Sequence, residues 1–129
     1  MTVKNIKDYF KSQYGWIDAI SIGKIDKDKE KAICFYDNNS ASPKIGTVGG
    51  KANCSYLIKP VSVLLRCTKN ADTAEIQAND IFNFFDEKEF IINGKRVFVI
   101  SRYQLPVSLG TDENGVYEYS MFFDFYFEK

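Results

Sequence analysis

The clearest pattern of hydrophobic and polar positions lies in the last stretch of the chain, from Val116 to Glu128. Its odd-numbered positions form one unbroken apolar row, whereas its even-numbered positions mix acidic residues with Phe122 and Tyr126. Because side chains alternate between the two faces of a sheet, this period of two predicts a β-strand. The odd row must be buried, since a slip of one residue would expose all of it. The even face suits partial exposure or contact with another subunit. The odd row consists of Tyr117, Tyr119, Met121, Phe123, Phe125 and Phe127.

Two other stretches have the period of a helix. In the first, Thr2 can cap a short helix that ends at Gly15 and places Val3, Ile6 and Phe10 on one side.

The second helix is the longer one and is predicted to open at Asp72. Asp72 and Glu75, three residues later, form a capping-box pattern of the acidic type. An apolar stripe follows at helical spacing, so we expect one face of this helix to pack on a sheet. The stripe consists of Ala74, Ala78, Ile81, Phe82 and Phe85.

Shorter hydrophobic runs predict the remaining strands. Residues 16–25 and 33–36 are typical of two strands, and the charged residues 26–31 between them predict a solvated hairpin connection. Residues 56–58 and 61–68 also have strand character. The proline between them, residue 60, cannot donate to a ladder and should mark a strand start, a bulge or an edge.

The second half of the chain predicts a meander. Asn93-Gly94 between two hydrophobic runs is a strong hairpin signal. Pro106 should break or bend the following strand, and residues 112–115 form a turn before the last one. The order of elements predicts a single α+β domain over residues 1–129, with a mixed, mostly antiparallel sheet and helices packed on one face.

The segment between residues 37 and 53 is unusually long for a connection inside a compact domain, which is generally functional or flexible. Its Gly46, Gly49, Gly50 and Lys51 look like a phosphate loop, but the spacing is one residue short. Ala52 also stands where a Ser or Thr would hold the metal, and a strand is expected to follow instead of a helix. The segment therefore does not predict nucleotide binding.

Charge and cysteine content narrow the setting of the protein. The 129 residues carry 17 Lys and Arg against 17 Asp and Glu, so no net field gathers nucleic acid or acidic lipid. No apolar run approaches the roughly 20 residues of a membrane helix. Cys34, Cys54 and Cys67 have no CxxC spacing, and the N-terminus lacks an apolar signal segment. A reduced, cytoplasmic setting is expected, with Cys34 and Cys67 as buried small hydrophobes.

Candidate chemistry is sparse. The chain has no histidine, which removes the Ser-His and Cys-His arrangements and most zinc sites. The acid pairs Asp26 with Asp28 and Asp112 with Glu113 lie in predicted turns, where solvated carboxylates are normal. We therefore predict that the protein is not an enzyme and uses no cofactor or metal.

Several stretches combine into a pattern that spans nearly the whole chain. They are residues 59–70 followed by the capped helix, residues 106–115, Tyr117-Glu118-Tyr119 with the aromatic strand that contains Asp124, the opening Tyr14-Gly15-Trp16-Ile17, and the glycines 46 to 50 ahead of Tyr56. Together they resemble the tail terminator and minor capsid proteins of long-tailed phages and prophages.

This resemblance implies an α/β subunit that assembles into a hexameric ring on the end of a finished tail tube, stops its polymerisation and offers a surface to the head connector. The implied partners are other copies of the chain, tail tube protein and head connector proteins, with no cofactor. The implied location is the virion tail, after assembly in the host cytoplasm. In such a ring each subunit presents different patches to its two neighbours.

We expect the contacts in the loop around residues 44–51, in the turn around residues 112–114 and on the even face of the last strand. Ordinary mobile turns remain the alternative for the loop and the turn. The candidate subunit or tube interface residues are Lys44, Gly46, Gly49, Gly50, Lys51, Asp112, Glu113, Asn114, Phe122 and Tyr126.

Two other functions stay open. A head-completion or connector protein of the same particle would lie on the head side of the joint. A host small-molecule-binding α+β module, the more distant alternative, would have an enclosed apolar pocket.

Overall fold

The computed structural model describes residues 1–37 and 48–129. These ranges form two α-helices, one short 3-10 helix and seven strands. The helices are α1 (Val3–Tyr14), η1 (Lys51–Asn53) and α2 (Ala71–Phe85). The strands are β1 (Ala19–Ile22), β2 (Ala32–Asp37), β3 (Tyr56–Arg66), β4 (Lys88–Ile92), β5 (Lys95–Ser101), β6 (Val107–Thr111) and β7 (Tyr117–Glu128).

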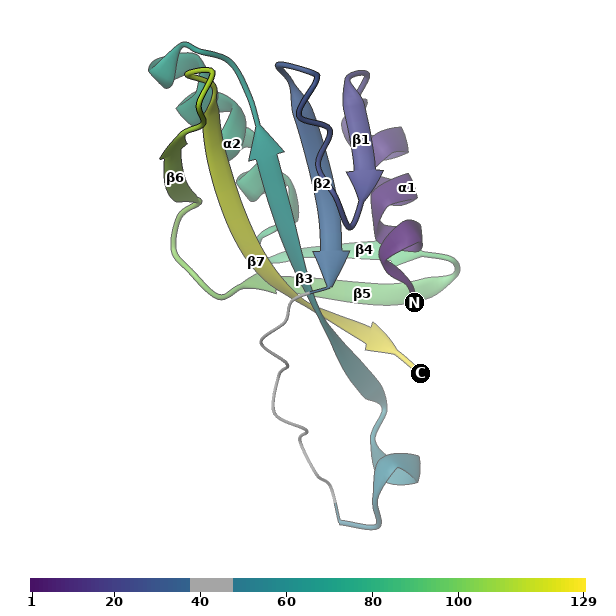
Figure 1. Cartoon of the computed structure of the whole chain (residues 1–129). Helices are drawn as coiled ribbons and strands as arrows, with labels where there is room; N and C mark the ends of the chain where they lie inside the picture. The colour runs from purple at the N-terminus through teal and green to yellow at the C-terminus, as the bar shows by residue number, and fades with distance from the viewer. Residues whose placement is uncertain (38–47) are drawn as a thin grey trace.

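All seven strands belong to one sheet. Its order is β1-β2-β3-β7-β5-β4, and β6 pairs with the part of β7 that β5 does not reach. The pair β1–β2 is parallel and the other pairs are antiparallel. Both α-helices lie behind the strands in Figure 1, so they cover one face of the sheet, and no α-helix of the described residues covers the other. The predicted α+β fold, with a mixed and mostly antiparallel sheet, is confirmed.

Strand β7 lies at the centre of the sheet. It pairs with β3 over eleven positions, from Tyr56↔Glu128 to Arg66↔Glu118, and with β5 and β6 on its other side. The odd row faces the helices, as the alternation predicts. Its four middle residues are buried, and Tyr117 and Phe127 at its ends pack partly buried against the same core.

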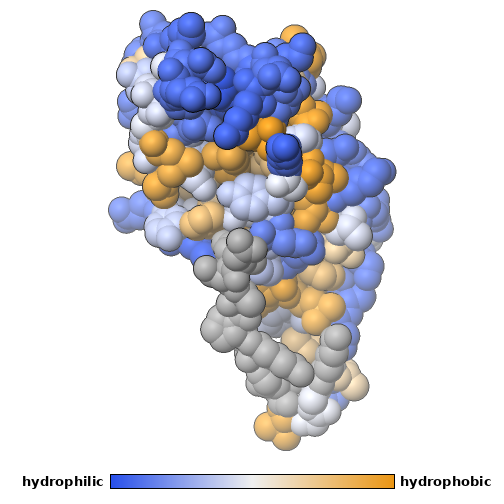
Figure 2. Space-filling view, viewed as in Figure 1, coloured by the Kyte–Doolittle hydropathy of each residue, from blue (hydrophilic) through white to orange (hydrophobic). Residues whose placement is uncertain are grey.

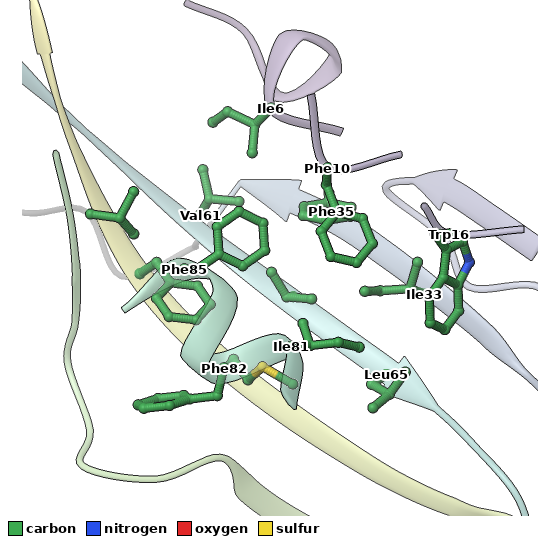
Figure 3. Packing of buried hydrophobic residues seen from close by; sticks show 14 of the residues in the cluster. Ile6, Phe10, Trp16, Ile33, Phe35, Val61, Leu65, Ile81, Phe82 and Phe85 are labelled. Atoms are coloured by element: carbon green, nitrogen blue, oxygen red, sulfur yellow. The ribbon is translucent and has the colours of Figure 1, made fainter. Parts of the chain in front are cut away.

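The core between the helices and the sheet is rich in aromatic rings. Phe85, at the end of α2, is 1% exposed. Its ring centroid lies 5.5 Å from that of Phe10 in α1, 5.2 Å from that of Phe123 and 5.8 Å from that of Phe125 in β7. Figure 3 shows Phe85 and Phe10 among the side chains of β2 and β3. One hydrophobic cluster therefore joins both helices to the sheet.

The ends of α1 follow the prediction. Thr2 accepts from the backbone N–H of Asn5, whose side chain accepts from the Thr2 N–H in return. Gly15 ends the helix with φ +81°, a conformation that favours glycine.

The predicted start of α2 is wrong by two residues. The N-cap is Asn70, whose side chain accepts from the backbone N–H of Thr73 at 3.0 Å. Because Asn70 precedes Asp72 and caps equally well, the helix begins at Ala71. Asp72 then lies in the first turn, where its negative charge interacts favourably with the positive end of the helix dipole. The predicted apolar stripe is buried at all five positions.

The predicted hairpin between the first two strands is also wrong, because β1 and β2 run parallel. Gly23, with φ +82°, turns the chain out of β1. Ile25 is then buried against Ala32 and Cys34 of β2, on the face of the sheet opposite the helices. The connection therefore crosses the sheet before the chain enters β2, while most of its charged residues stay exposed. The hairpin prediction considered only the charges of this stretch, and these do not indicate that Ile25 is buried.

Strand β3 is continuous across both runs of predicted strand character, residues 56–58 and 61–68, and ends at Arg66. Pro60 lies inside it, opposite Asp124 of β7. On its other side, β3 pairs with β2 as far as Asp37↔Val61, and Val61 is the residue that follows Pro60. Among the described residues, Pro60 therefore has a ladder partner in β7 only, which fits the predicted edge position of a residue without an N–H.

The hairpin β4–β5 is confirmed. Asn93 and Gly94 both have positive φ, 52° and 76°, as a two-residue type I′ turn requires.

Candidate functional site

The structure separates the candidate interface residues into two ends and a connecting face. The described part of the loop, Gly49 to Lys51, precedes the start of β3, and the turn Asp112 to Asn114 precedes the start of β7. Because β3 and β7 run antiparallel in register, these segments lie at opposite ends of the strand pair (Figure 1). Eleven paired residues span about 30 Å at the usual rise per residue. Lys44 and Gly46 lie outside the described residues.

At the loop end, a tight turn precedes η1. Gly49 and Gly50 have φ +90° and +81°, and the side-chain amide of Asn53 donates to the Val48 carbonyl at 2.9 Å. A Cβ on Gly49 would lie 1.8 Å from that amide nitrogen, so the Asn53 side chain would have to move, and the positive φ of Gly49 itself favours glycine. The side chain of Val48 is 97% exposed. The turn therefore holds an apolar side chain out into solvent.

At the other end, Asp112 organises the turn between β6 and β7. Its carboxylate accepts from the backbone N–H groups of Asn114 and Val116, both at 2.9 Å, and from the buried guanidinium of Arg66. The Val116 N–H and the Arg66 guanidinium hold the pKa of Asp112 below its usual range. Because Asp112 is committed within the chain, Glu113 and Asn114, whose side chains are exposed, are the residues of this turn available to a partner.

Between the two ends, Phe122 and Tyr126 lie on the face of the sheet without helices, as the alternation in β7 predicts. Both are half-buried. The ring of Phe122 lies 5.6 Å from that of Tyr103, and the ring of Tyr126 lies 5.9 Å from that of Tyr56. Within the part of the chain that the structure describes, neighbouring aromatic side chains cover these two residues and no helix does.

The open face extends beyond the two predicted residues. We use this name for the apolar side chains of β3, β5, β7 and the segment after β5 that lie on the side without helices. In β5, Phe98 pairs with Tyr126 and is 41% exposed, and Ile100 pairs with Asp124 and is 39% exposed. Figure 2 shows hydrophobic residues across the middle of this face, below a hydrophilic upper end. The open face consists of Tyr56, Ile58, Phe98, Ile100, Tyr103, Phe122 and Tyr126.

The sequence contained a signal for these additional residues. Positions 97 to 100, Val-Phe-Val-Ile, are apolar without alternation, which is typical of a strand covered on both faces. In the structure Val97 and Val99 face the core, whereas Phe98 and Ile100 face away from it.

An ion pair lies in the middle of the open face. The guanidinium of Arg102 contacts the carboxylate of Asp124 at 2.9 and 3.1 Å. Both side chains are largely shielded from solvent, 25% and 18% exposed. The pair neutralises both charges, so it leaves the surrounding surface apolar and aromatic.

Two clefts formed by described residues lie near the helices. The first, of about 300 Å³, is lined by Tyr14, Trp16, Gln77 and Asp80 among others. The Tyr14 hydroxyl donates to the Asp80 carboxylate and accepts from Gln77 at 2.7 Å. Burial and the Asp80 carboxylate raise the pKa of Tyr14, so the phenol stays neutral at physiological pH. These hydrogen bonds hold α1 to α2.

The second cleft, of about 430 Å³, lies beside β4 and is lined by Tyr9, Gln13, Glu89, Phe90, Ile91 and Arg96. Its rim carries positive and negative side chains. The Arg96 guanidinium lies 2.6 Å from the Glu128 carboxylate and 3.9 Å from the Glu89 carboxylate. The arrangement suits a solvated surface groove.

The cysteines and the acidic side chains were compared with the requirements of a reactive thiol and of a metal site. Cys34 and Cys67 are buried as predicted, and burial raises the pKa of both thiols. Residues 1–37 and 48–129 contain no group of three or more cysteine or acidic side chains placed to hold a metal ion. Neither α1 nor α2 has the length and hydrophobicity of a membrane span, and the described ranges contain no other candidate.

Comparison with known proteins gives one match. A family model described as "Bacteriophage tail terminator protein" matches residues 9–129. The comparison with curated proteins gave no match. The comparison with solved structures gave none either.

Proposed function

The chain belongs to the bacteriophage tail terminator family and is a structural protein of the phage tail, and from this premise we propose that it closes the end of the tail tube as a ring. In this proposal the ring ends tube polymerisation and forms part of the interface between tail and head. The partners are other copies of the chain, tail tube protein and head connector proteins. Assembly takes place in the host cytoplasm before the finished tail joins a head.

The observation that carries this proposal is the placement of the candidate contacts at opposite ends of β3 and β7. A terminator needs three kinds of surface: one toward the tube, one toward the head, and lateral surfaces toward its neighbours. The turn at Val48 to Gly50 and the turn at Glu113 and Asn114 lie at the two ends of the longest strand pair. One rigid element can therefore hold two binding surfaces about 30 Å apart.

The open face supports binding to protein. Aromatic side chains are enriched in protein interfaces, and contiguous apolar patches on a soluble surface mark interaction sites. Phe98 and Tyr103 are 41% and 50% exposed on this face, beside a neutralised ion pair. Such a surface acts by shape and burial, so the proposed activity requires no cofactor and no catalytic group.

The first experiment measures the mass of the purified protein by light scattering over a concentration series, alone and with tail tube protein. We expect a closed ring, or a monomer that joins tube ends only, and tubes of limited length by electron microscopy. A protein that binds head connectors but leaves tube growth unchanged would point to the connector function. A monomer that is indifferent to both partners, but gains thermal stability with a small molecule, would refute the proposal.

The second experiment tests the two ends with Val48→Asp and Glu113→Lys. Both side chains are exposed, so the melting temperature should stay within about 2 °C of the wild type. We expect one variant to lose control of tube length and the other to lose joining of heads to tails. Ile76→Asp, a charge placed on the exposed side of α2 at 61% exposure, is the matched control and should retain both activities. Full activity of both end variants would remove the ends from the interface.

A further inference from the structure

Three strands lie at the borders of the sheet and have a neighbouring strand on one side only within the described residues: β1, β4 and β6. An unpaired edge presents a row of backbone N–H and C=O groups and is a template for another strand. Natural proteins usually protect such edges with charged residues, above all lysine. β4 follows this rule, because it contains Lys88 and Glu89.

The other two edges are unprotected in this sense. β1 has the sequence Ala-Ile-Ser-Ile and β6 has the sequence Val-Ser-Leu-Gly-Thr, so neither contains a charged residue or a proline. All five residues of β6 are exposed, with Leu109 at 54%. Ile22 of β1 is 45% exposed. Two of the three edges thus lack charged side chains and proline, although the ladder of β6 with β7 has a register shift between Ser108 and Gly110.

The ladder registers place these two edges at the same height of the sheet. Ile20 of β1 pairs with Ile33, which pairs with Leu65, which pairs with Tyr119, which pairs with Ser108 of β6. The next row runs in the same way from Ser21 to Val107. β1 and β6 are therefore the two borders of one five-stranded section, β1-β2-β3-β7-β6, and Figure 1 shows them on opposite sides of it.

The strand directions also fit. β6 runs antiparallel to β7 and hence parallel to β3, whereas β1 runs antiparallel to β3. If the β1 of a second copy, held upright like the first, lay beside β6, the new pair would be antiparallel, the more stable arrangement. The helices of both copies would stay on the same side of the extended sheet.

We propose that neighbouring copies of this chain join by pairing the β6 edge of one subunit with the β1 edge of the next, so that the five-stranded section continues from subunit to subunit. The Gly23 N–H donates to the Phe35 carbonyl of β2, so in this parallel ladder residues 19, 21 and 23 bond toward β2, and the free edge offers the backbone groups of Ile20 and Ile22. The contact is heterologous, because each subunit gives a different edge to each neighbour, and it closes by rotation. This inference rests on the ring of the proposed function and names its lateral contact.

The test places one lysine on each of the three edges of the full-length protein: Leu109→Lys on β6, Ile22→Lys on β1, and Ile91→Lys on β4 as the control. Ile91 is 67% exposed, so the control adds the same charge at a site of similar exposure. We expect each of the first two variants to raise the midpoint concentration of assembly at least about tenfold, which corresponds to about 1.4 kcal/mol. The control should stay within about twofold, and all three should melt like the wild type.

Mixing the two edge variants distinguishes this pairing from a symmetric one. Ile22→Lys protein retains an intact β6 edge and Leu109→Lys protein retains an intact β1 edge. An equimolar mixture should therefore give a dimer of one copy of each and nothing larger. If β6 paired with β6 instead, Ile22→Lys protein alone would assemble like the wild type, and the proposal would be overturned.

Amide hydrogen exchange on the wild type supplies a measurement that needs no substitution. In the assembled protein, amides of β1 and β6 should exchange at least about tenfold more slowly than in the monomer, whereas amides of β4 should not change. Equal exchange of β1 and β6 in both states would refute the strand pairing.

The results also separate this inference from the proposed function. If the wild type stops tubes as a ring and the edge variants assemble normally, the edge pairing is wrong and the proposed function stands. If the edge variants block assembly but wild-type rings leave tube length unchanged, the pairing stands and the tube-ending function is wrong. A wild type that never assembles, even at tube ends, overturns both.

Discussion

Phe85 is the side chain through which the packing of α2 on the sheet can be tested most directly. It is 1% exposed, and its ring lies within 6.3 Å, between centroids, of six other aromatic rings. Truncation to alanine removes the ring and leaves a cavity that these large neighbours cannot fill without shifting. Phe85→Ala is therefore expected to destabilise the fold strongly.

The magnitude follows from the usual scale of core truncations. Phe to Ala costs about 3 to 5 kcal/mol, and the lost ring pairs place this site in the upper half of that range. A loss of about 4 kcal/mol is a large part of the roughly 5 to 15 kcal/mol that stabilise an ordinary domain. With a urea slope of about 2 kcal/mol/M, the unfolding midpoint should fall by about 2 M.

The assay is urea unfolding followed by circular dichroism, at a concentration where the protein is monomeric. Phe98→Ala is the matched control, because it removes the same ring from the opposite face of the sheet, where the side chain is 41% exposed. We expect the control to lose about 1 kcal/mol or less. A loss below about 2 kcal/mol for Phe85→Ala, or equal losses for the two variants, would refute the assignment of the core to the helix side.

Three further predictions concern acid, a cap and a turn. The pKa of Asp112 is lowered because two backbone N–H groups and a guanidinium stabilise its charged form. Its contribution to stability is therefore present above the unfolded-state pKa of about 3.9 and is lost as the pH falls through the lower folded-state pKa. The urea midpoint should accordingly fall between pH 5 and pH 3, by less in Asp112→Asn; a flat profile would contradict the interpretation. Asn70→Ala should cost about 1 kcal/mol and Asp72→Ala less, and the reverse order in urea unfolding would restore Asp72 as the cap. Gly94→Ala should cost about 1 kcal/mol through its φ of +76° alone, because its Cβ would meet no atom within 4 Å; an unchanged melting temperature would argue against the type I′ turn.

Part of the candidate site could be predicted because it depends on local alternation. The period of two in β7 placed Phe122 and Tyr126 on the face opposite the buried row, and the structure leaves that face without helices. The role of Asp112 was different. Its carboxylate accepts from Arg66, which lies 46 positions away in the chain, and no local pattern indicates a contact of that separation. The turn was predicted, and Glu113 and Asn114 remain candidate contact residues, but the hydrogen bonding of Asp112 to Arg66 was not predicted.

Local sequence patterns were sufficient to specify several elements of the fold. A period of two specified β7, a period of 3.6 specified the stripes of both helices, and Asn93-Gly94 specified a turn that requires two positive φ angles. Each of these depends on residues within a few positions of one another.

Only the tertiary structure decided how the strands meet. The parallel pairing of β1 with β2 accompanies the burial of Ile25 against β2, and the place of Pro60 in the sheet is given by its pairing with Asp124 of β7. The shared height of β1 and β6 results from four successive ladders, and no single segment encodes it. Pairing between distant segments is selected by the packing of the whole core, so the two borders of the sheet, and the subunit contact proposed for them, emerge only from the folded chain.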